Sequence, residues 1–159
     1  MTNQFELVHA ARSTSFGPAA PGSGMFGGIQ LICKSFLLEF LPLAQGESQP
    51  DLWHVLVFLA SDGFIIQGQS HLSQKEMRKL GRSLLDLVQN KAGQMSFLSP
   101  SRTLYLAVHS SKEPGSFLVS GHLLRSSTGI VSAFESLVTP HHLRRFAKEL
   151  QRFPHPTSR

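Results

Sequence analysis

The sequence predicts an α+β domain in which two βββα units build one antiparallel sheet and both helices pack on one face of it. A repeat is the first observation behind this prediction. The stretch "DGFIIQGQSHLSQKEMRKL", which begins at Asp62, matches "TGIVSAFESLVTPHHLRRF", which begins at Thr128, at nearly every hydrophobic and basic position. The second observation is that strand-like runs precede a helix-like run in both halves. One such unit could not bury its sheet face alone, so two units in one fold are expected.

The first half is expected to contain strands over 29–43, 53–60 and 63–69, followed by a helix over 73–90. The pair Asp62-Gly63 between apolar runs is typical of a hairpin turn, because glycine accepts a positive φ without strain. Ser73 is expected to cap the helix, with Glu76 completing a capping box. Apolar residues at helical spacing predict the buried face of this helix: Met77, Leu80, Leu84, Leu87 and Val88.

The second half repeats this order, with strands expected over 103–110, 116–126 and 129–136 and a helix over 139–153. Thr139 is expected to cap this helix, and Pro140 stands at its first position, where a helix tolerates proline. The two halves therefore predict equivalent secondary structure.

A single domain is expected over 29–154, with halves at about 29–92 and 93–154. Residues 1–28 precede it as a leader rich in Gly, Pro and Ser, a composition typical of a loop or a partly mobile linker. The stretch "FELVH" within this leader is compatible with a short edge strand.

The composition favours a cytoplasmic protein. Cys33 is the only cysteine, so the chain forms no internal disulfide, which is typical of a reducing compartment. The first residues are polar and mixed, so a secretory signal is not expected. No apolar run reaches the ~18 residues of a membrane span.

Charge is distributed unevenly along the chain. Residues 1–72 carry a net charge of −3 and residues 73–159 carry +8, which together give the formal net charge of +5. Basic residues recur on the outer faces of both predicted helices, and they are the candidate phosphate-binding residues: Arg78, Lys79, Arg82, Arg144, Arg145 and Lys148. Such faces are typical of a patch that binds phosphate or an acidic protein, or of a solvated helix surface that binds nothing.

No catalytic or metal signature is present in the sequence. His141 and His142 are adjacent and therefore point in different directions on a helix, and no HExxH or paired CxxC motif occurs. Cys33 lies in an apolar run, where a thiol behaves as a small hydrophobic residue. The glycines lack the Lys-Ser/Thr that a phosphate-binding loop needs. We therefore expect no catalytic residues, no metal and no cofactor.

Alternation along the predicted strands indicates a candidate partner site on the sheet face away from the helices. Residues of one parity, such as Val55 and Leu106, are expected under the helices, so the residues of the other parity face away. That second set is too apolar for an ordinary solvated surface, and its histidines and tyrosine suit an interface. The candidate partner-binding residues are His54, Leu56, Phe58, Tyr105, His109 and His122. Burial of this face by residues 1–28 or by a symmetric dimer is the alternative.

Three stretches carry a resemblance to a known family: "LLEFLPL…DLWHVLVFLASDGFIIQGQSHLSQKEMRKLGRSLLDLV", "MSFLSPSRTLYLAV" and "LLRSSTGIVSAFESLVTPHHLRRFAKELQRFP". Over about residues 36–154, this pattern resembles WapI-type immunity proteins and related bacterial domains of unknown function. The resemblance implies a small cytoplasmic binder that neutralises a toxin without catalysis. It transfers no functional residues, because the shared positions are mostly core ones: Trp53, Leu80, Leu84, Phe97, Leu98, Leu104 and Leu150. The positive net charge argues against a nuclease toxin, whose active site is itself positive.

The sequence thus favours a non-enzymatic protein-binding domain, most specifically an immunity-type inhibitor of a bacterial toxin. The partner is another protein, with a toxin suspected, or a second copy of the chain. The alternatives are an adaptor that binds nucleic acid through its basic helix faces and a small structural homodimer.

Overall fold

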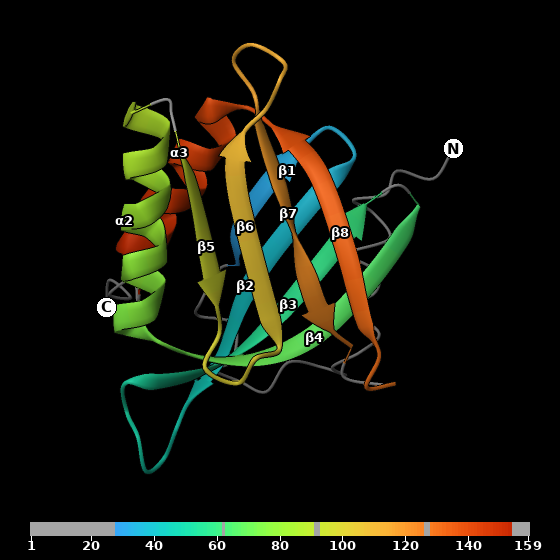
Figure 1. Ribbon diagram of the computed structural model, residues 1–159. Coiled ribbons are helices and arrows are strands. Elements are labelled where there is room, and N and C mark those ends of the chain that lie inside the picture. The colour runs from blue at the N-terminus through green and yellow to red at the C-terminus, as the bar shows by residue number, and fades with distance from the viewer. Residues whose placement is uncertain (1–27, 62, 91–92, 126–127, 154–159) are drawn as a thin grey trace.

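A computed structural model describes residues 28–61, 63–90, 93–125 and 128–153. Within these ranges the chain forms two four-stranded antiparallel sheets and two helices (Figure 1). Sheet A has the order β1-β2-β3-β4, formed by Ile29–Cys33, Phe36–Gln45, Leu52–Ser61 and Phe64–Ser73. Sheet B has the order β5-β6-β7-β8, formed by Gln94–Leu98, Leu104–Ser110, Phe117–Leu124 and Val131–Val138. The helices are α2, Gln74–Asn90, and α3, Pro140–Gln151. Neither of these helices is long and apolar enough to cross a membrane.

The α+β class and the repeated strand–helix order are confirmed, but each unit has four strands and forms a sheet of its own. The expected run over 29–43 is a hairpin, because the backbone turns at Lys34, whose φ is 49°. No Gly, Pro, Asn or Asp marks that turn in the sequence. Strand β5, which is the counterpart of β1 in the second unit, was not expected either. Glycine at position 63 has a φ of 88°, in keeping with the predicted hairpin turn, whose other residue, Asp62, lies outside the described residues.

The inner faces of the two sheets share one core. Phe36 of sheet A contacts Phe134 of sheet B, with ring centroids 6.1 Å apart. The sheets come closest where β4 passes β7: a Cβ added to Gly68 would lie 2.4 Å from the carbonyl oxygen of Leu124. The sheets are farther apart on the side of β1 and β5, where α2 and α3 jointly cover the opening between them (Figure 1).

Each helix packs against the first strand of the other unit. α3 lies along β1, and α2 lies against β5 (Figure 1). The ring of Phe146 on α3 meets Phe40 of sheet A edge-on, with centroids 5.6 Å apart. The two helices also cross closely, because a Cβ at Gly81 would lie 2.6 Å from the carbonyl oxygen of Ala147. Neither unit is therefore complete without the other.

Both predicted helix caps are confirmed. The backbone N–H of Ser73 donates to the carboxylate of Glu76 at 2.7 Å, and the N–H of Glu76 donates to the hydroxyl of Ser73 at 3.1 Å. The hydroxyl of Thr139 accepts from the N–H of His142, and Pro140 occupies the first turn. These bonds fix where each helix begins relative to the strand before it.

Leu84→Ala and Leu150→Ala should each lower the free energy of unfolding by about 2–5 kcal/mol, because both side chains are fully buried between the helices and the sheets. Urea denaturation followed by circular dichroism measures this change. Lys79→Ala, on the exposed face of α2, is the matched control and should change stability little. Losses below ~1 kcal/mol at both leucines would contradict the described core.

Candidate functional site

The outer face of sheet A is largely buried. Leu56 and Phe58 are fully buried, so neither side chain is available to a partner. Beside Phe58 lies Glu39, also buried, whose carboxylate accepts a hydrogen bond of 3.0 Å from the side chain of Gln30. His54 is exposed and packs edge-on against the ring of His71, with centroids 4.2 Å apart. The alternative in which residues 1–28 cover this face concerns residues 1–27, which lie outside the described residues.

The outer face of sheet B is open to solvent. Tyr105 and His122 are cross-strand partners on β6 and β7, and their rings stack with centroids 5.7 Å apart and planes 25° from parallel. Leu98 and Ala133 flank this pair in the same row across the sheet. A second row contains His109, which is half-buried. We call the outward-facing residues of β5–β8 the open face.

A hollow of about 480 Å³ lies at one end of the open face. Its lining combines apolar, aromatic and cationic groups: Leu98, Arg102, Thr103, Tyr105, His122, Leu124 and Val131. This combination of apolar contact area and a few polar groups is typical of binding surfaces.

The six candidate partner-binding residues therefore do not form one site. Tyr105, His109 and His122 share the open face, whereas His54, Leu56 and Phe58 lie on the outer face of sheet A. The error follows from the expected single sheet, which would have placed both sets side by side. On both sheets, however, these residues alternate with the core residues of their strands and lie on the outer face, as the sequence predicted.

Three exposed apolar residues of the open face were not predicted from the sequence. Leu98, expected in the core, is 51% exposed, and Val131 and Leu137 are 58% and 40% exposed. Alternation along "VSAFESLV" could have predicted Val131 and Leu137, because they lie on the same face of the strand as Ala133. No signal in the sequence distinguishes a face that is covered from one that is open.

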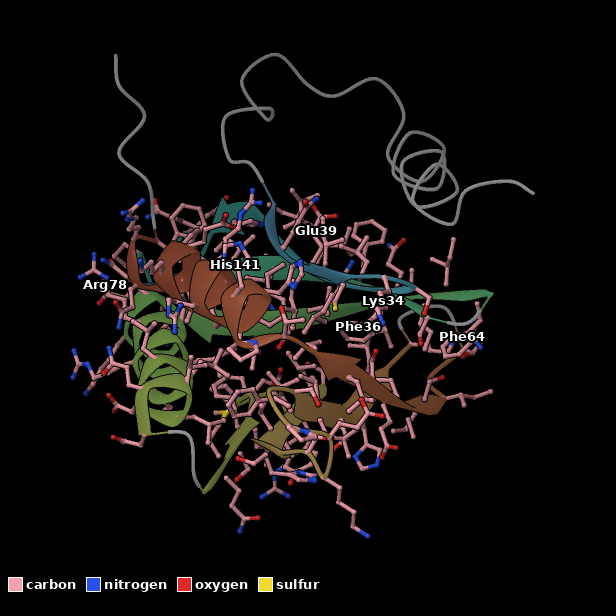
Figure 2. The ribbon with its side chains drawn as sticks, turned by 90° about the horizontal axis from the view of Figure 1, so that it is seen from above. Lys34, Phe36, Glu39, Phe64, Arg78 and His141 are labelled. Carbon is pink, nitrogen blue, oxygen red and sulfur yellow. The ribbon has the colours of Figure 1, made fainter. Side chains whose placement is uncertain are left out.

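The basic residues of both helices lie on the side of the molecule that the helix pair occupies. All six candidate phosphate-binding residues are exposed. A hollow of about 750 Å³ at the start of α2 is lined by Asp51, Ser73, Gln74, Lys75, Arg78, Lys79 and Arg82. Figure 2 shows Arg78 directed outward from α2, on the opposite side of the molecule from Phe64.

Two of these cations have hydrogen-bond or ion-pair partners within the chain. The guanidinium of Arg78 donates to the carbonyl oxygen of Phe153 at 3.2 Å, which ties the start of α2 to the end of α3. Arg145 pairs with Glu149 on the next turn of α3 at 3.4 Å. Asp51 adds a negative charge to the hollow itself. The surface is basic but only partly free to meet phosphate.

Histidine and cysteine do not assemble into a reactive centre in the part of the chain that the structure describes. No group of three or more His, Cys, Asp or Glu side chains there is placed to hold a metal ion. The Nδ1 atom of His142 is hydrogen-bonded to the hydroxyl of Thr139, so this histidine takes part in the helix cap. Cys33 is buried in the shared core.

No protein-family model matches the chain, and no curated protein matches it either.

Generic RNA and DNA should bind no tighter than about 10⁻⁴–10⁻⁶ M at physiological salt, the range of non-specific contacts. Fluorescence anisotropy with labelled oligonucleotides measures this affinity. Such weak binding should fall steeply with salt, and it should fall further when Arg78, Arg82, Arg144 and Lys148 are replaced by glutamine. A submicromolar complex that these four substitutions abolish would contradict this expectation and favour the nucleic-acid adaptor.

Proposed function

We propose that this chain is a cytoplasmic, non-enzymatic protein-binding domain that holds its partner on the open face of sheet B. The observation that carries the proposal is the exposure of apolar side chains around the stacked Tyr105–His122 pair. Contiguous apolar surface of this kind is costly to leave in water and commonly marks an interaction site. The phenol and imidazole groups supply hydrogen bonds that function in both wet and dry surroundings.

The distribution of charge supports a partner surface that is neither strongly acidic nor strongly basic. Glu135 places a negative charge on the open face and Arg102 places a positive charge at the hollow beside it, whereas the basic residues of α2 and α3 lie on the helix side. Apolar packing would then supply most of the affinity, with the Tyr105–His122 pair at its centre and Arg102 at its margin fixing orientation. Such a division between an apolar centre and a polar rim is usual in protein interfaces.

Within this class, an immunity-type inhibitor of a bacterial toxin is the specific function that we propose. Its support is the resemblance of residues 36–154 to WapI-type immunity proteins, together with an exposed face that suits a protein partner. An inhibitor of this kind acts by occupying the toxin surface, so it needs no reactive group of its own. The basic helix surface favours a nucleic-acid adaptor as the second candidate.

Toxicity assays in cells test the proposal directly. The toxin domain encoded beside this gene should stop growth when expressed alone, and co-expression of this chain should restore growth. Leu98→Asp and His122→Asp together should abolish the rescue, because they place two carboxylates in the apolar surface. Lys75→Asp and Lys79→Asp, two exposed substitutions on α2, are the matched control and should leave rescue intact. The absence of a neighbouring toxin gene, or rescue by the open-face variant, would contradict the proposal.

A further inference from the structure

β8 is an edge strand of sheet B along which neither described helix packs. α3 packs along β1, and α2 packs against β5. β4, the outermost strand of sheet A on the same side, approaches β7 through its inner face, where Gly68 lies close to Leu124. Across the described ranges, β8 pairs with β7 alone, and Figure 1 shows it at the rim of the molecule opposite the helices. The outer edge of β8 therefore presents backbone N–H and C=O groups that a further strand can pair with.

The sequence of β8 has few of the features that normally protect an exposed edge. "VSAFESLV" contains no Lys, Arg or Pro, and Glu135 is its only charged residue. Its pairing with β7 runs without a bulge from Val131 to Val138. By contrast, the ladder between β2 and β3 shifts register between Pro42 and Ala44. A regular, weakly charged edge strand is a template for strand addition.

Exposed apolar side chains gather at this same edge. Ile130 and Val131 are each 58% exposed, and Leu137 is 40% exposed. Val131 and Leu137 lie on the open face, at the two ends of β8. A strand added beside β8 would therefore cover apolar area as well as backbone groups.

We propose that β8 pairs antiparallel with β8 of a second copy of this chain, which joins the two B sheets into one continuous sheet. Residues opposite one another must lie on the same face, and two registers then share the longest overlap. One places Phe134 opposite its own copy, and the other places Glu135 opposite its own copy. Directly opposed like charges destabilise a sheet, so the first register is favoured.

The favoured register is self-complementary along its length. Val131 lies opposite Leu137 of the second copy at both ends of the strand, so each end forms an apolar pair. Glu135 lies opposite Ala133, and on the other face Ser132 lies opposite Ser136, where paired hydroxyls form hydrogen bonds. A twofold interface requires this match of one surface with itself.

The charge distribution also permits this association. The chain carries a net charge of +5, but the exposed cations of α2 and α3 lie on the side away from β8 (Figure 1). Pairing through β8 keeps the two basic helix surfaces far apart and limits their repulsion. The dimer also places two open faces side by side. It goes beyond the proposed function, because it forms without any partner protein.

Sedimentation velocity of the full chain at rising micromolar concentration tests this inference. We expect a species of twice the 17.5 kDa chain mass. Val131→Glu and Leu137→Lys should each weaken the dimer at least about tenfold, the effect of ~1.4 kcal/mol. An equimolar mixture of the two variants should dimerise again, because the carboxylate introduced into one chain would then meet the ammonium group introduced into the other. Leu98→Lys, a matched substitution on β5, should leave the dimer intact.

Circular dichroism spectra that match the unsubstituted chain establish that each variant is folded. A monomer at every concentration would overturn the inference. Dimers unaffected by either charged variant would overturn it too, since association would then use another surface. Failure of the mixture to dimerise would equally overturn it. None of these results bears on toxin rescue, which depends on the open face of a single chain.

Discussion

Neither sheet of this protein can bury its inner face without the other, and the rest of the structure depends on that constraint. The sheets approach closely at Gly68 and diverge toward β1 and β5. The space between the diverging strands is filled by α2 and α3 together. α2 and α3 can fill it because Gly81 lets their backbones approach. Aromatic residues from both sheets and α3 then occupy a single core. The missing side chains at two glycines thus set the spacing between the sheets and between the helices.

This packing leaves two outer faces, and equivalent positions of the two units carry chemically different residues on them. Leu56 on sheet A corresponds to His122 on sheet B, and Phe58 corresponds to Leu124. The first residue of each pair is fully buried, whereas His122 is exposed and Leu124 is half-buried. The outer face of the first unit is largely buried, whereas that of the second exposes apolar side chains to solvent.

Local signals in the sequence predicted most elements of the fold, because strand alternation, helical spacing and capping residues depend on near neighbours. The Ser73–Glu76 box and the apolar stripe through Leu84 are examples. The hairpin at Lys34 was missed because a lysine holds the positive φ there. The division into two sheets was missed because it depends on where strands pair over long distances. For the site, alternation placed Tyr105 and His122 correctly, but it could not show that Leu56 and Phe58 would be covered.

Each helix packs against the first strand of the other unit, and this arrangement affects how the chain folds during synthesis. The first sheet and α2 leave the ribosome before β5 and α3 exist, so α2 has no complete docking surface at that stage. On the inner face of sheet A, Phe36 lacks its contact with Phe134 until β8 has emerged, and Phe40 lacks its contact with Phe146 until α3 has emerged. The core is therefore completed only after α3 is synthesised, and a chain cut before α3 would expose an aggregation-prone apolar surface.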